Sequence, residues 1–260
     1  MNLGLPLSTM IAFLLVLARV GGLITFLPIP GFRGAPEIIR VVLVLAITIA
    51  LFPVWPSLPD EVPALGELVK WVFAEAGFGL LIGVAIAFLT EGFQVAAQVL
   101  GMQAGYGYAS TIDPTTQADA ALLQVLMNLM TGVLFFTTGA DRALIRVLAA
   151  SFEKFPAGSW FTSPATLDAV VRLGSGMFTV GLRMALPVTA LLLLIDLALA
   201  LLGRIQQQIQ LLSLSFPVKM LTALSMLAVL SPVIARLFEG SASRTLEVLW
   251  SFVAQAPGPR

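Results

Sequence analysis

The chain has 260 residues, of which 58% are apolar and only 11% are charged, and its mean hydropathy is +0.99. An average soluble domain carries roughly 25% charged residues, so this composition indicates a membrane protein. The 14 Lys and Arg residues balance the 14 Asp and Glu residues. That balance excludes a basic surface for nucleic acid and an acidic tail for a cationic partner.

The chain contains no cysteine and no histidine. The first absence excludes disulfides and thiolate metal sites, and the second excludes Ser-His hydrolysis and His-ligated zinc. An intramembrane aspartyl protease would need a second aspartate in a neighbouring apolar helix, and a nucleotide-driven motor would need a phosphate-binding loop of the G-x-x-x-x-G-K-[ST] type. The sequence has neither. We therefore expect a protein that is not an enzyme and that uses no metal or cofactor.

Six apolar runs and a weaker seventh predict an all-α fold, with runs at 5–29, 38–55, 71–104, 120–150, 169–202, 210–237 and 244–254. The first run lacks the basic start and the cleavage site of a secretory signal, so we expect it to be retained. Each of the first six could span a membrane, because about 20 apolar residues cross a hydrocarbon core of ~30 Å. The third, fourth and fifth runs would extend roughly 45 to 50 Å as unbroken helices. These helices are therefore either broken, or they project beyond the bilayer and meet other protein.

Proline and glycine punctuate the connections between the runs. The sequence PIPGFRGAPE at 28–37 predicts a tight connection in which Pro36 and Glu37 suit the first turn of the next helix. The proline-rich stretches at 54–63 and 155–164 predict two further loops. No linker divides the chain into separate soluble domains, so we expect residues 1–260 to form a single domain. The positive-inside rule favours a cytoplasmic position for the first connection, because basic residues surround it.

Small residues recur at intervals of four in the third run. Gly79, Gly83 and Ala87 form this ladder, and Gly101 extends the same spacing toward the loop that follows. Such a ladder allows the backbone of a second helix to approach closely. Two interpretations remain open, namely ordinary packing inside the chain and a seam between molecules.

Charged residues inside the apolar runs need partners, because a charge in hydrocarbon costs at least ~2.5 kcal/mol. The candidates are Arg19, Glu75, Glu91, Arg183, Asp196 and Lys219. Asp196 lies within LLLLIDLALALLG, which offers no histidine or second aspartate for a proton relay. A structural ion pair or a hydrogen-bonded protein interface is therefore the favoured interpretation.

A polar stretch, RIQQQIQLLSLSFPVK at 204–219, interrupts what would otherwise be one long apolar hairpin. Its polar residues at the turn are Arg204, Gln206, Gln207, Gln208 and Gln210. Such side chains cannot lie unpaired in lipid. The stretch is either the aqueous turn of a helical hairpin or a polar belt that docks on another subunit, and the two interpretations are compatible.

The loop LGMQAGYGYASTIDPTTQADAALLQ at 100–124 is rich in glycine and small polar residues. Asp113-Pro114 favours a turn, and Asp119 suits the cap of the next helix. Nothing in this loop is catalytic in form. It could be a gating or plugging segment, or an ordinary external loop.

Four segments in order resemble the FliR family, a component of the flagellar type III export gate, and its injectisome counterpart SctT. They are RVGGLITFLPIPG with the following RVVLVLAITIALFP, then GMQAGYGYASTIDP, then the stretch from NLM to the FE before Pro156, and finally ALPVTALLLLIDLALALLGRIQQQIQLLSLSFPVK. The likeness covers nearly the whole chain. No single segment is a catalytic fingerprint, and the resemblance rests on their order and spacing.

The resemblance implies an all-α fold with long kinked helical hairpins, similar to a fusion of two companion subunits, FliP and FliQ. The FliP-like part would cover approximately 1–200, and the FliQ-like hairpin would fall within 169–260. The implied partners are FliP and FliQ in one gate complex, with FlhB and FlhA beside it, unfolded flagellar substrates and membrane lipid. The implied location is the bacterial inner membrane, multi-pass, in the flagellar basal body, with helices largely above the bilayer plane.

The family resemblance also assigns the glycine-rich loop as a plug of the central channel, which here maps to 105–117. Its residues are Gly105, Tyr106, Gly107, Tyr108, Ala109, Ser110, Thr111, Ile112, Asp113 and Pro114, with Tyr106, Tyr108 and Ile112 as bulky fillers. The chain departs from the family at Ile112, where a phenylalanine is common, and at Gln207, where a proline is common. An injectisome homologue and, less favoured, a self-contained secondary transporter with Asp196 as the coupling carboxylate are the rival interpretations.

Overall fold

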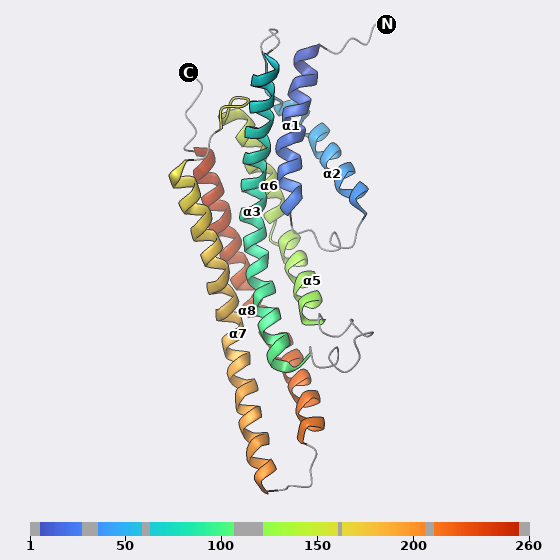
Figure 1. The fold of residues 1–260 in the computed structure, drawn as a ribbon, viewed down its shortest axis with the longest axis vertical. Helices are drawn as coiled ribbons and strands as arrows, with labels where there is room; N and C mark the ends of the chain where they lie inside the picture. Colours follow the sequence, from blue (N-terminus) through green and yellow to red (C-terminus); the bar gives the residue numbers. More distant parts are fainter. Residues whose placement is uncertain are drawn as a thin grey trace. The chain divides into compact units, whose positions relative to one another are not determined.

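The fold is that of a computed structural model, in which residues 6–27, 36–58, 63–106, 122–160, 163–205 and 211–254 are described, with 211–214 described by their backbone alone. All regular elements in these ranges are helical (Figure 1). They are α1 (Leu7–Phe26), α2 (Glu37–Ala50), the short 3₁₀ helix η1 (Phe52–Val54), α3 (Leu65–Ala104), α5 (Leu122–Thr137), α6 (Ala140–Lys154), α7 (Pro164–Ile205) and α8 (Leu211–Ala254). The predicted all-α fold class is confirmed.

Four of the described helices are long and apolar enough to cross a membrane, namely α1, α3, α7 and α8, and the bent pair α5 and α6 raises this to five if it forms one span. The second run, which could have been a spanning helix from its apolar length, is not among these candidates. That run forms α2, which has 14 residues where a span needs about 20. Leu51 leaves the helical region and η1 follows, so the run ends before it reaches that length.

The fourth run is broken, which is one of the two alternatives that its length required. Helices α5 and α6 meet at an angle of 62°. Gly139 lies at the break with a φ of +73°, a left-handed conformation that is strained for residues with a side chain. The single apolar run therefore contains two helices.

The other overlong runs are not broken. Helix α3 has 40 residues and α7 has 42, so each extends roughly 60 Å, about twice the thickness of the hydrocarbon core. The sixth and seventh runs were expected as separate elements, but they form one helix, α8, of 44 residues. Pro217 and Pro232 lie inside α8 without ending it, as proline often does in apolar helices whose freed carbonyls find other partners.

The chain divides into two compact units, each built from segments far apart in the sequence. Unit 1 comprises 1–88, 135–174 and 242–260. Its core is the packing of α1 against α3, where the backbones approach so closely that a Cβ on Gly79 would lie 1.9 Å from the carbonyl oxygen of Arg19. Gly83 faces Leu23 in the same way, with 2.6 Å to its carbonyl oxygen. Helix α2 lies beside α1 (Figure 1).

Unit 2 comprises 89–134 and 175–241. In it α3 and α7 also pack through glycines, because a Cβ on Gly92 would lie 2.9 Å from the carbonyl oxygen of Met177 and one on Gly181 would lie 2.9 Å from that of Gly92. The rings of Phe93 on α3 and Phe238 on α8 pack 5.5 Å apart. These contacts make α3 the helix to which α7 and α8 of this unit attach.

Candidate functional site

The base of the glycine-rich loop is the end of helix α3. Gly105 has a φ of +84°, and its N–H donates to the carbonyl of Met102 while the N–H of Tyr106 donates to that of Gly101, at 3.2 and 3.0 Å. This pair of bonds around a left-handed glycine is a Schellman motif, which ends a helix and satisfies its last carbonyls. The direction in which the chain leaves α3 is therefore fixed.

Both residues at this base contact α8. The hydroxyl of Tyr106 donates to the carbonyl oxygen of Met220 at 3.0 Å, and a Cβ on Gly105 would lie 2.5 Å from the ring of Phe216. Tyr106 is only 5% exposed. A phenol with the ordinary pKa of about 10 is already protonated at neutral pH, and burial raises the pKa of Tyr106 further. Tyr106, expected as a bulky filler of the plug, is packed inside unit 2.

The remaining residues of the expected plug lie outside the described residues. They are Gly107, Tyr108, Ala109, Ser110, Thr111, Ile112, Asp113 and Pro114. The same holds for four residues of the polar turn, namely Gln206, Gln207, Gln208 and Gln210. Arg204 is described, exposed in the last turn of α7, where a cation complements the negative end of the helix dipole.

Asp196 and Lys219 join the two arms of the helical hairpin. The ammonium of Lys219 donates to Oδ2 of Asp196 at 3.0 Å, and the two side chains are 12% and 40% exposed. Lys219 neighbours Met220, the residue that holds Tyr106. An ion pair was one of the interpretations favoured for Asp196, and this geometry fits it.

A second polar cluster lies in unit 1 and is more deeply buried. Nε of Arg19 on α1 donates to Oε2 of Glu75 on α3 at 2.5 Å, with side chains only 1% and 2% exposed. Nη1 of Arg19 donates to Oγ of Ser151 on α6 at 2.7 Å. The other oxygen of Glu75 accepts from the backbone N–H of Gly158 at 3.0 Å. The Arg19–Glu75 ion pair thus also binds α6 through Ser151 and the following loop through Gly158.

Aromatic rings complete the surroundings of this Arg19 cluster. The guanidinium carbon of Arg19 lies 4.2 Å from the ring centre of Phe152 and 5.0 Å from that of Phe78, distances at which a ring face attracts a cation. Gly158 has a φ of +71°, and a Cβ there would lie 2.0 Å from Trp71. The cluster therefore fixes where α1, α3 and α6 cross and where the loop after α6 turns.

The other residues singled out from the sequence fall in different surroundings. Glu91 is half-buried and Arg183 is exposed on α7. In the small-residue ladder, Gly79 and Gly83 lie at the crossing with α1, Ala87 is half-buried, and a Cβ on Gly101 would meet no atom within 4 Å. The first two glycines thus serve packing within the chain.

Sequence reasoning missed several residues that complete these sites. Ser151 and Gly158 hold the buried pair, and they follow the fourth run rather than lying among intramembrane charges. Gly92 and Gly181 bring α3 and α7 together. Gly92 directly follows Glu91, which was already singled out in the sequence for its charge, but Gly92 itself was overlooked. Its spacing does not fit the ladder of four.

The chain is similar to known proteins over nearly its whole length. The family model described as "Bacterial export proteins, family 1" matches residues 10–245. The chain belongs to this family. The flagellar biosynthetic protein FliR of Escherichia coli (strain K12) is 29% identical over 245 residues, which cover 93% of this chain and 92% of the relative. The FliR of Bacillus subtilis (strain 168) is 26% identical over 249 residues, covering 94% and 95%.

A third FliR, from Pectobacterium carotovorum subsp. carotovorum, is 26% identical over 238 residues, covering 91% of this chain and 90% of the relative. The family resemblance predicted from the sequence is therefore confirmed: the chain belongs to a family of bacterial export proteins, and these three relatives are named as flagellar biosynthetic proteins. The match includes α1 through most of α8, so the Arg19 cluster, the loop base and the hairpin ion pair all lie inside it.

Proposed function

We propose that this FliR-family chain is a non-enzymatic subunit of the flagellar export gate, built with FliP and FliQ and contacting FlhB and FlhA in the inner membrane. The gate would be a conduit for unfolded flagellar proteins, and the segment that follows Gly105 would close it at rest. Flagellar rather than injectisome membership is supported by the shared name of the relatives.

The observation that carries the proposal is the exposure of the hairpin helices. Only 17% of the most apolar window of α7 and 11% of that of α8 is buried within the chain, against 50% for α1. The exposed side of α7 also carries Arg183, and a charge facing lipid near mid-helix costs at least ~2.5 kcal/mol. An apolar face that carries an arginine is typical of a surface covered by other protein chains. Arg183 would then contact polar groups or water in that interface.

The loop base supports the gating part of the proposal. The Schellman motif and the Tyr106–Met220 hydrogen bond give the segment a fixed start on α8. A plug must return to the same closed position after each opening. A segment whose first residue is fixed on α8 has fewer other positions available, so an anchored end favours that return. Tyr106 is then an anchor of the plug, and Tyr108 and Ile112 remain as its proposed apolar fillers.

The test is a leakage measurement on cells that carry variants of the loop. One variant deletes 107–112, and a second replaces the same residues with glycine and serine at equal length, which removes the apolar bulk alone. We expect increased ion leakage with both variants. If the deletion leaks and the glycine-serine replacement does not, the length of the loop closes the gate and its apolar side chains do not. A gate as tight as the wild type with both variants would overturn the plug.

A further inference from the structure

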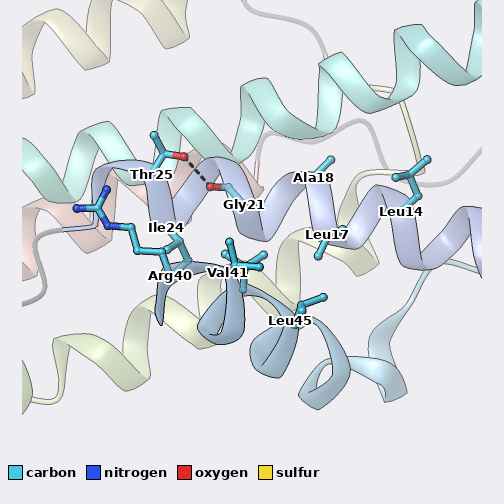
Figure 2. Close-up of a pocket in the computed structure, with 10 residues that line it drawn as sticks. Leu14, Leu17, Ala18, Gly21, Ile24, Thr25, Arg40, Val41 and Leu45 are labelled. Carbon is cyan, nitrogen blue, oxygen red and sulfur yellow. Dashed lines mark hydrogen bonds between the residues drawn. The ribbon is translucent and has the colours of Figure 1, made fainter. Parts of the chain in front are cut away.

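A pocket of about 420 Å³ lies between α1 and α2 in unit 1 (Figure 2). Its existence follows from the residues on the facing sides of the two helices. Ala18 and Gly21 of α1 lie on the side that faces α2, and they leave space that the larger Val41 and Leu45 of α2 do not fill. A Cβ on Gly21 would meet only Cγ1 of Val44, at 4.0 Å. The pocket volume is in the range of small-ligand sites.

The pocket has a polar end and an apolar end. Figure 2 shows Arg40 at the end nearest Thr25, with Leu14 at the opposite end. The hydroxyl of Thr25 already donates to the carbonyl of Gly21 at 2.8 Å. Arg40 takes part in an interaction of its own, but a guanidinium has several N–H donors and can hold an anion as well. The ligand that this lining favours has one anionic group and a hydrocarbon body.

The position of the pocket points to the membrane as the source of that ligand. Helix α1 is long and apolar enough to cross a membrane, and a groove along a spanning helix opens at hydrocarbon depth. Arg40 lies one turn from the start of α2, close to the end of α1, which is where a headgroup would lie. The nearest acidic residue in sequence, Glu37, is exposed and is not part of the lining.

We propose that this pocket binds an anionic phospholipid, with an acyl chain between α1 and α2 and the phosphate at Arg40. A planar guanidinium pairs with phosphate oxygens in a two-pronged geometry that a zwitterionic headgroup would also offer, and the net negative charge of the headgroup then selects the anionic lipid. The site is separate from the loop base and from the Arg19 cluster, and the proposal does not depend on the gate function.

The test measures lipid retention by native mass spectrometry of the full-length chain in its complex, reconstituted in nanodiscs of phosphatidylglycerol or of phosphatidylcholine. We expect one additional tightly held lipid per chain with phosphatidylglycerol. Arg40→Gln should weaken its retention about fivefold, the effect of one basic residue near an anionic lipid surface. The matched control is Arg244→Gln, at an exposed position on α8 outside the pocket.

A second pair of variants tests the acyl-chain part. Gly21→Leu extends a side chain into the pocket without a backbone clash, and Gly66→Leu makes the same change on α3 where a Cβ meets nothing within 4 Å. We expect loss of the lipid with the first variant alone. Equal retention in wild type, Arg40→Gln and Gly21→Leu would overturn the proposal. So would a photo-crosslinker at Val41 that labels a protein chain of the complex instead of lipid.

Discussion

Arg19 and Glu75 form an ion pair across 56 residues of sequence, and both side chains are almost fully buried. Such a pair stabilises a fold only while both members and their other hydrogen bonds are present, because a single buried charge is costly. The pair is the point at which three helices and the following loop of unit 1 meet, so it sets the position of α1 against α3.

The first prediction concerns the loss of one member of this pair. Glu75→Gln keeps the shape of the side chain but leaves Arg19 without a countercharge, and we expect a destabilisation of about 3 to 5 kcal/mol. The measurement is the temperature at which the purified complex loses its folded form. Glu67→Gln, at an exposed position of the same helix, should change little. A double variant, Arg19→Met with Glu75→Leu, should recover part of the loss, and equal stability of Glu75→Gln and wild type would contradict the account.

The second prediction separates two glycines of the same ladder. Gly79→Ala places a Cβ against the backbone of Arg19, whereas Gly101→Ala meets open space. We expect Gly79→Ala to cost about 1 to 3 kcal/mol or more, since the contact is with backbone, and Gly101→Ala to be neutral or to stabilise by up to about 1 kcal/mol. Thermal unfolding of the two variants side by side checks this. If Gly101→Ala were the more harmful, that glycine would serve a contact with another chain.

The third prediction concerns the loop base. Gly105→Ala combines a left-handed backbone with a contact to the Phe216 ring, while Gly139→Ala has the left-handed backbone and no neighbour within 4 Å. Backbone strain alone costs about 1 to 2 kcal/mol, so the extra effect at Gly105 reports the contact with α8. We expect Gly105→Ala to be the less stable variant and to increase ion leakage. Leakage equal to that of Gly139→Ala would separate the loop base from the gate.

The fourth prediction uses the two tyrosines of the chain, Tyr106 and Tyr108. In a Tyr108→Phe variant, Tyr106 is the only tyrosine of this chain. The difference in phenolate absorbance between complexes that carry this variant and complexes that carry Tyr106→Phe with Tyr108→Phe reports its titration. Because burial raises its pKa above the ordinary value of about 10, the stabilisation from the neutral phenol is fully present below that value and is lost as pH rises through the higher folded value. We expect a midpoint above that of free tyrosine. A midpoint at the ordinary value would show that the side chain leaves its packed position.

Composition and hydropathy predicted the all-α membrane fold, because apolar content and run length depend on local sequence alone. The pairing of Arg19 with Glu75 could not be predicted, since it depends on which helix α1 crosses and at which turn. The length of the fourth run allowed a break, but its position at Gly139 was hidden, because one glycine inside an apolar run changes the mean hydropathy little. Helices α5 and α6 nevertheless differ in direction by 62° at this point. Asp196 and Lys219 were both marked as charges, but their pairing became clear only when the hairpin was folded.

The central claim is that the apolar faces of α7 and α8 are covered by chains of different sequence. Its most direct test is native mass measurement of the chain expressed alone and together with FliP and FliQ. We expect one heteromeric complex on co-expression, and poor recovery or aggregation of the chain alone. A chain that is recovered alone as a stable, uniform species and that does not associate with its co-expressed companions would contradict it.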